Sequence, residues 1–258
     1  MDNDIFKEDY YSNFERNIRL NISYNGFHYH GWQIQSNAKT IQGEIKEAIS
    51  VFIKDKIRIF GASRTDTGVH ALGQVANFYT NSDKTCDEIA WILNKRLPGD
   101  INIKSALDVP KDFNARRSAK GKHYRYKIWA GYQKPVFEKK LVYWCPCRDL
   151  DIDSMICASK KLIGTHDFSS FASNSKKIIE DKIRHVAEIE IKKEDNLIVF
   201  DVKGVSFLYK MVRGICGTLF EMGRGKKIDI EELLESKDRT KAQRNLPGHG
   251  LYLVEVYY

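Results

Sequence analysis

Apolar and polar residues alternate in several short stretches of the chain, beginning with "IRLNISY" at 18–24. Ile18, Leu20 and Ile22 occupy every second position there, which is the pattern of a strand buried on one face. The same reasoning predicts further strands at "KIRIF" (56–60), "QVANFY" (74–79), "INIKSALDV" (101–109), "HYRYKIW" (123–129) and "GLYLVEVYY" (250–258).

Other stretches carry apolar residues at helical spacing. In "TIQGEIKEAISVFIKD" (40–55) they recur every three or four positions, and Thr40 is placed to cap the first turn. Further helices are predicted at 86–97, where Pro98 ends the pattern, and at 151–163, 208–222 and 229–235. A hairpin is predicted from 185–191 to 197–205, turning at 194–196.

This mixture of helices, strands and hairpins predicts an α+β fold made of two units, each a sheet with helices on one face. We divide the chain into a polar N-terminal leader (1–17), an N-terminal α+β lobe (18–110) and a C-terminal α+β lobe (111–258). Because no Gly/Ser-rich linker marks the boundary, we expect one sheet to continue across both lobes.

Length and composition indicate a soluble globular protein. The 258 residues are enough to bury a sizeable core, and no apolar run approaches the roughly 18 residues that span a membrane. The start, "MDNDIFKEDYYSNFERN", is polar and lacks the apolar stretch of a secretory signal. Five cysteines, an odd number in a large chain, argue against a disulfide framework. These features predict a cytoplasmic protein.

The charge balance favours an anionic partner. The formal net charge is +8, and "RRSAKGKHYRYK" at 116–127 holds six cations, no acid and two interleaved tyrosines. Further basic groups lie at 175–177, 224–227 and 237–244. Cations that contact phosphates, mixed with rings that stack on bases, are typical of nucleic-acid binding. The alternative is a basic strand face that merely contacts solvent.

The polar stretch "GASRTDTGVHA" at 61–71 is the strongest candidate for chemistry. It gathers Arg64, Asp66 and His70 after an apolar run, and Gly68 permits the positive φ of a tight turn. The alternative is a structural ion pair in a polar turn. Asp66 and His70 could form two ligands of a metal, but a lone histidine is more often packed and hydrogen-bonded.

Motifs for other chemistries are missing from the sequence. "CPC" at 145–147 lacks zinc-finger spacing, and no phosphate-binding glycine loop, dinucleotide fingerprint or serine nucleophile elbow occurs. We therefore expect a reaction that uses no metal and no cofactor.

Several motifs in order resemble the tRNA pseudouridine synthase A family. The signature is "SRTDTGVHALGQVANF", and the similarity covers most of the chain, through "YNGFHYHGWQIQ", "LPGDI", "DFNARRSAKGKHYRYKIW", "HDFSSFA", "FLYKMVRGICGTL" and "GHGLYLVEV". Two departures are Ser63, where the family usually has Gly, and Asn25, where Asp is common. Ser63 adds a side chain to a tight loop but removes no catalytic group.

The resemblance implies the pseudouridine synthase fold, with two α+β lobes, a central antiparallel-rich sheet and a basic active-site cleft. It also implies isomerisation of uridine to pseudouridine at positions 38, 39 and 40 of the anticodon arm of tRNA, by a homodimer without a cofactor. Carried over by residue, Asp66 is the essential carboxylate and Tyr124 packs on the target base. Arg213 pairs with the carboxylate, and Arg64 supports the loop and contacts RNA.

Three points stay open at this stage. The aspartate could add covalently to the sugar or remove the C2′ proton to give a glycal-type intermediate. Tyr124 could only stack on the base, or its hydroxyl could also assist proton transfer at C5. The alternative functions are an RNA-binding protein of the same fold without catalysis, and a family member that acts on other uridines.

Overall fold

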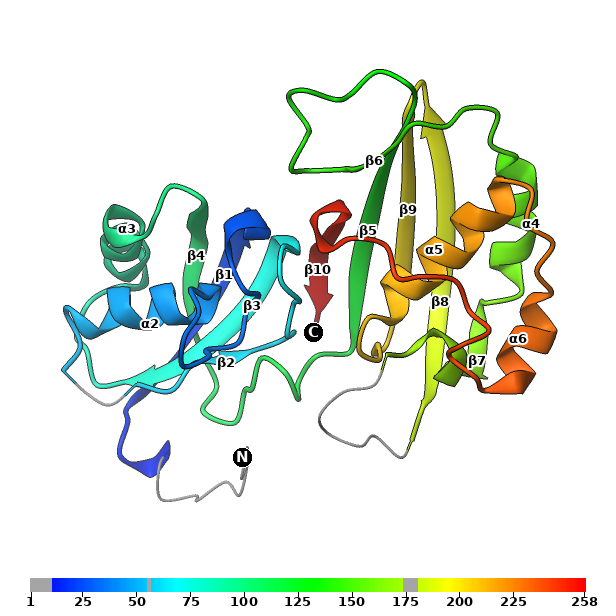
Figure 1. The fold of residues 1–258 in the computed structure, drawn as a ribbon. Helices are drawn as coiled ribbons and strands as arrows, with labels where there is room; N and C mark the ends of the chain where they lie inside the picture. Colours follow the sequence, from blue (N-terminus) through cyan, green and yellow to red (C-terminus); the bar gives the residue numbers. More distant parts are fainter. Residues whose placement is uncertain (1–10, 55–56, 174–180) are drawn as a thin grey trace. The chain divides into compact units, whose positions relative to one another are not determined.

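The computed structural model describes residues 11–54, 57–173 and 181–258. The basic group at 175–177, Lys56 of the predicted strand and the first ten residues of the predicted leader lie outside these ranges. The chain forms two compact units, drawn in Figure 1: the first holds the described residues up to Thr67, Ala71–Ala119 and Tyr258, and the second holds Gly68–His70 and Lys120–Tyr257. Within the described ranges, no helix is both long enough and apolar enough to cross a membrane.

The first unit is an antiparallel sheet with two helices. Strand β1 (Arg16–Tyr24) lies between β3 (His70–Thr80) and β4 (Ile101–Val109), and the two-residue β2 (Phe60–Gly61) pairs with β3. Helices α2 (Ile41–Ser50) and α3 (Cys86–Arg96) lie together against this sheet (Figure 1), and the short 3-10 helix η1 (Gly26–His28) follows β1.

The predicted alternation of β1 determines which face of that sheet is buried. Ile18, Leu20 and Ile22 have no solvent exposure, and they share the core with apolar residues of the helices: Ile41, Ile45 and Ile49 of α2 and Ile89 and Leu93 of α3. Thr40 caps α2 as predicted, accepting the Gly43 N–H. The sequence pattern therefore identified the elements that build this core.

The strand predicted at "KIRIF" is wrong in extent. Ile57 and Ile59 are buried at alternating positions, but only Phe60 and Gly61 pair with β3, opposite Asn77 and Ala76. The alternation was correct, yet burial alone does not make a strand, because a strand also needs a partner for its backbone groups.

The second unit is a larger antiparallel sheet. Its strands run in the order β10 (Leu251–Tyr257), β5 (Gly121–Ala130), β9 (Leu197–Gly204), β8 (Ile183–Glu194) and β7 (Gly164–Asp167), while β6 (Tyr143–Cys145) pairs in parallel with β5. The helices are α4 (Ile152–Lys160), α5 (Met211–Gly223) and α6 (Ile230–Ser236), with 3-10 turns η2 (Ser169–Phe171) and η3 (Gly248–Gly250). The hairpin from β8 to β9 turns at Asp195, which has a φ of 51°.

Strand β5 is divided by its alternation into an apolar face and a charged face. Tyr124, Tyr126 and Ile128 point into the core, whereas His123 and Arg125 lie on the opposite face beside Asp201 of β9. Arg125 holds Asp201 with two hydrogen bonds of 2.9 and 3.0 Å, and a ring nitrogen of His123 lies 2.6 Å from the same carboxylate. Burial favours a raised pKa for Asp201, but the hydrogen bonds from His123 and Arg125 and the Arg125 charge outweigh it and lower the pKa to about 2.

We predict that Asp201→Asn destabilises the second unit. A folded-state pKa of about 2, below the ordinary value of 3.8, means that the stabilisation is fully present above about pH 4 and is lost as the pH falls towards 2. The substitution should lower the free energy of opening of β5 and β9 by on the order of 2 kcal/mol at pH 7, since it leaves an arginine incompletely paired. Peptide-resolved amide hydrogen exchange at pH 7, 4 and 2.5 measures this.

The control is Asp108→Asn in the first unit. Asp108 also holds an arginine through two hydrogen bonds, but its side chain is 56% exposed against 11% for Asp201. Its loss should cost at most about 1 kcal/mol. Equal losses for both variants, or a loss for Asp201→Asn that does not shrink below pH 4, would contradict the assignment.

Candidate active site

The loop between β2 and β3 alternates between buried and exposed residues. Ser63 and Thr65 are buried, whereas Arg64 is exposed and Asp66 is partly exposed. A segment with this alternation directs successive side chains to opposite sides. Arg64 and Asp66 therefore lie on the outward side of the loop, and two residues of chain keep their Cα atoms at most about 7 Å apart.

The loop is held from the inside by the side chain of Gln74, a fully buried residue of β3. Its Oε1 accepts the backbone N–H of Ser63 at 3.2 Å, and its Nε2 donates to the Ser63 carbonyl at 2.8 Å. One side-chain amide thus satisfies both backbone groups of a loop residue, as a neighbouring strand would. Ser63, the departure from the family pattern, fits this buried position.

A second anchor holds Thr65, on the other side of Arg64. The Thr65 and Tyr24 hydroxyls lie 2.8 Å apart, and Gln74 Nε2 donates to the Tyr24 hydroxyl at 3.4 Å. The Thr65 carbonyl accepts the Trp32 N–H at 3.0 Å. These contacts join both anchors into one buried network.

Close approach of two backbones makes the second anchor possible. Gly31 has a φ of +86°, and a Cβ there would lie 2.4 Å from the Thr65 carbonyl oxygen. Any other residue would push the loop away. The loop that carries Arg64 and Asp66 is therefore fixed before any substrate binds.

The end of the loop leads into the buried residue His70. Gly68 adopts the predicted positive φ, +76°, and His70 is buried with its ring stacked on Tyr252 at 4.7 Å. A ring nitrogen of His70 lies 3.1 Å from the carbonyl of His249. Burial lowers the pKa of His70 to about 4, so the ring is neutral at physiological pH. His70 is thus the packed residue that the sequence favoured. Among the described residues, no group of three or more His, Cys, Asp and Glu side chains could hold a metal ion.

Tyr124 lies in the second unit, on the core-facing side of β5. It is buried, and its ring meets the edge of Phe207 with centroids 5.3 Å apart at 87°. This T-shaped contact fixes the plane of the ring.

Arg213 lies in the first turn of α5 and is partly exposed. Its Nε donates to the Leu246 carbonyl at 2.7 Å, and the Leu246 N–H donates back to the Arg213 carbonyl at 3.3 Å. Burial lowers the pKa of His249, and the charge of Arg213 adds to the effect. Arg213 therefore sits near the η3 turn, whose His249 carbonyl lies against His70.

The four predicted site residues are divided between the two units. Arg64 and Asp66 share one loop of the first unit, and Tyr124 and Arg213 belong to the second. Sequence reasoning missed the residues that support the loop, Gln74 and Tyr24. The sequence did contain one sign of this support. Gln74 is polar, but it stands at a position of its strand where the apolar pattern predicts a buried side chain.

The basic stretch at 116–127 is less uniform than its composition suggests. Arg125 is committed to Asp201, and Lys127 lies over the Tyr252 ring at 4.7 Å with a pKa lowered by burial. Arg116 and Arg117, in contrast, are exposed. The stretch thus combines structural cations with cations that face solvent.

Comparisons with known proteins agree with the motifs. A family model described as tRNA pseudouridine synthase matches residues 21–116 and 158–258. The chain is 46% identical over 245 residues to tRNA pseudouridine synthase A of Acetivibrio thermocellus, covering 94% of this chain and 100% of that protein. The protein of the same name from Caldicellulosiruptor bescii is 44% identical with the same coverage, and that of Ruminiclostridium cellulolyticum is 42% identical over 247 residues, covering 94% and 100%. The chain therefore belongs to the tRNA pseudouridine synthase family, and its α+β architecture is the pseudouridine synthase fold.

Proposed function

We propose that this protein isomerises uridine to pseudouridine in tRNA, with Asp66 as the essential carboxylate. The observation that carries the proposal is the anchoring of the 63–66 loop within a chain of this family. Buried hydrogen bonds hold Ser63 and Thr65, so Asp66 faces outward on a fixed backbone. Preorganised placement of a reacting group is a main source of enzymatic rate.

The reaction is an isomerisation that requires no redox or hydrolytic group. The N1–C1′ bond breaks, the uracil turns, and C5 bonds to C1′; the proton then leaves C5, and N1 takes one up. Asp66 either adds to C1′ and is released later, or removes the C2′ proton and returns it. Both routes use one carboxylate and leave the atoms balanced.

The other residues act on the base and on the carboxylate. Tyr124 packs on the target uracil, supported by its edge contact with Phe207. Arg213 pairs with Asp66 during the reaction, and its guanidinium is oriented by the Leu246 carbonyl. Arg64 contacts the RNA and supports the loop. A uridine in a stem must first leave the stack, and stacking on Tyr124 offsets part of that cost, which is a few kcal/mol.

The substrate positions that we propose are 38, 39 and 40, in the anticodon arm of tRNA. The net charge of +8 and the exposed cations of the basic stretch support binding to a folded RNA. We place the enzyme in the cytoplasm, where its five cysteines, all free thiols, remain reduced.

We also propose that the enzyme is a homodimer. The segment after β5 exposes three large apolar side chains: Tyr132 by 63%, Val136 by 75% and Phe137 by 94%. Such exposure is costly for a monomer and typical of an interface.

We predict that Asp66→Asn abolishes pseudouridine formation and leaves tRNA affinity within about threefold of wild type. One carboxylate performs the chemistry, whereas many cations bind the RNA. Tritium release from 5-tritiated uridine in tRNA measures turnover, and filter binding measures affinity.

The matched control is Asp112→Asn, at an exposed carboxylate of the same unit, which should behave as wild type. Turnover by Asp66→Asn close to that of wild type would remove Asp66 from the mechanism. Absence of turnover in the wild-type enzyme would favour the alternative, an RNA-binding protein without catalysis.

A second prediction concerns the buried anchor of the loop. Thr65→Val removes the hydroxyl that meets Tyr24 but keeps the shape, so the second anchor loses its side-chain contact and keeps only the hydrogen bond from the Trp32 N–H. We expect kcat to fall by roughly ten- to a hundredfold with KM nearly unchanged, because the carboxylate is displaced while the RNA contacts remain. Thr65→Ser restores the hydroxyl and should recover most of the rate. A serine variant as slow as the valine variant shows that the hydroxyl is not what positions Asp66.

A third prediction concerns the dimer. Phe137→Ser together with Val136→Ser should shift the protein to a monomer, because both changes replace exposed apolar side chains without touching a core. Light scattering at matched concentrations measures the mass. A wild-type protein that is already monomeric contradicts the proposal, as does a dimer unaffected by both substitutions.

A further inference from the structure

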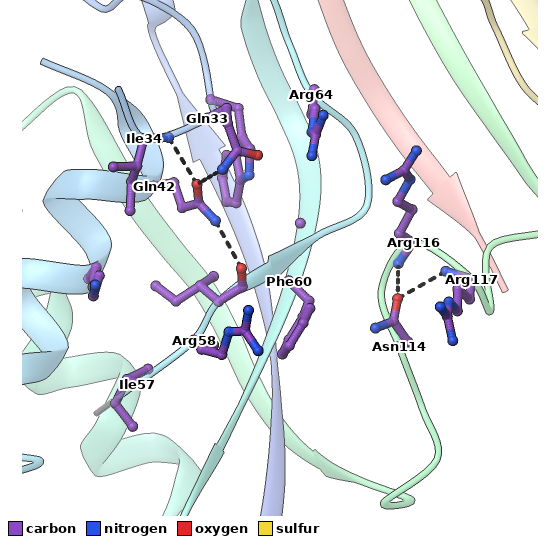
Figure 2. Close-up of a pocket in the computed structure, with 14 residues that line it drawn as sticks. Gln33, Ile34, Gln42, Ile57, Arg58, Phe60, Arg64, Asn114, Arg116 and Arg117 are labelled. Carbon is purple, nitrogen blue, oxygen red and sulfur yellow. Dashed lines mark hydrogen bonds between the residues drawn. The ribbon is translucent and has the colours of Figure 1, made fainter. Parts of the chain in front are cut away.

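A cavity of about 510 Å³ opens in the first unit, on the side of the loop that carries Arg64 (Figure 2). Three segments form its walls: residues 32–34 with the start of α2, residues 57–61, and the turn at 114–117. Arg64 lines it as well, so the cavity adjoins the active-site loop. Its volume is in the range of sites that enclose a small ligand.

The floor of the cavity is built by the buried side chain of Gln42. Its Oε1 accepts from the Gln33 side chain at 2.9 Å and from the Ile34 N–H at 3.0 Å, and its Nε2 donates to the Ile59 carbonyl at 2.9 Å. A single amide thus joins a helix and two loop segments, as the dashed lines of Figure 2 show. The cavity is therefore a fixed feature of the fold.

The third wall is fixed in the same way. Asn114 Oδ1 accepts the N–H groups of Arg116 and Arg117 at 3.0 and 3.1 Å, and Asn77 of β3 accepts the N–H of Ala115 at 2.9 Å. This turn holds the backbone of two consecutive arginines at the cavity (Figure 2).

All the charged side chains that line the cavity are cations. Five exposed cations line it: Lys46, Arg58, Arg64, Arg116 and Arg117. Within the described part of the chain, no aspartate or glutamate is among the lining residues. Several cations around one cavity make the local potential positive, which attracts an anion. Guanidinium groups match the geometry of a phosphate in particular.

The cavity also has an apolar part, which a bare phosphate would leave unused. Phe60 is half-buried and lines the cavity with Ile34 and Ile57. Figure 2 shows the Phe60 ring between the Arg58 side chain and the turn that carries Arg117. An aromatic ring beside cations suits a nucleotide, whose base can stack while its phosphate is held.

We propose that this cavity binds a nucleotide of the RNA substrate adjacent to the one that is isomerised, with its phosphodiester on Arg58 and Arg117 and its base against Phe60. The proposal rests on the proposed function, since it takes RNA as the substrate. RNA is favoured over a free nucleotide because Arg64, which lines the cavity, is two residues from Asp66, so the Cα atoms of the two are at most about 7 Å apart. An occupant of the cavity is thus close enough to belong to the same strand as the target uridine.

The test is a scan of an anticodon stem-loop RNA with one neutral methylphosphonate linkage at each position in turn. Dissociation constants are measured for wild type, Arg58→Ala, Arg117→Ala and the control Arg96→Ala, whose arginine is exposed on α3 outside the cavity. We expect each cavity variant to bind unmodified RNA about tenfold more weakly and with a shallower salt dependence, by about 0.7–0.9 in slope for each lost phosphate contact. Arg96→Ala should bind like wild type.

The decisive result is whether the effect of a methylphosphonate on the dissociation constant depends on the arginine substitution. At one linkage, the methylphosphonate should weaken wild-type binding about tenfold or more and should weaken binding by Arg58→Ala and by Arg117→Ala clearly less, because each variant has already lost one of the two guanidinium contacts to that phosphate. The proposal is overturned if no linkage couples to either variant. It is also overturned if free uridine monophosphate, tested by calorimetry, binds the cavity below about 1 mM without such coupling. Tritium release by wild type on the same RNA is a separate reading, so a failure of the proposed function is distinguishable.

Discussion

The site in the first unit depends on one buried amide, the side chain of Gln74. Buried backbone N–H and C=O groups must be paired, and the paired residues of β2 and β3 end at Gly61, before Ser63. Gln74 supplies both a donor and an acceptor at that point. The loop can therefore remain irregular, with Arg64 and Asp66 directed outward, at no cost in unpaired polar groups. An apolar residue at position 74 would bury equally well but would leave those groups unsatisfied.

Amides are used repeatedly for this purpose in the first unit. Gln42 joins α2 to residues 33–34 and to Ile59, and Asn77 holds the 114–117 turn. Each joins segments that no ladder of backbone hydrogen bonds connects. These hydrogen bonds hold the irregular segments, and those segments carry the arginines. These neutral side chains therefore fix the backbone from which the arginines extend.

The regular elements were predictable and the supporting contacts were not. The strand at 101–109 has the predicted bounds, and the helix predicted at 86–97 ends one residue earlier, before Pro98. In contrast, β3 begins at His70, four residues before the predicted start. The pattern missed these four residues because apolar and polar side chains do not alternate in them. Short strands such as β6 depend on a distant partner and carry no periodic signal. The partner of Gln74 is likewise set by tertiary structure, so the sequence showed only that a polar residue lies in an apolar strand.

The loop that carries Asp66 and the cavity share a backbone connection through Trp32. Its N–H donates to the Thr65 carbonyl at 3.0 Å, while its own carbonyl accepts the N–H of Gln42 at 3.0 Å. The residue that holds the loop is thus bonded to the residue that builds the cavity floor. Both hydrogen bonds depend on the position of Trp32, because its N–H and its C=O each pair with one of the two segments. The loop that carries Asp66 and the cavity lined by Arg64 are for this reason connected through a single residue. An RNA strand that engages both would meet a surface whose spacing is set by the fold and not by the strand.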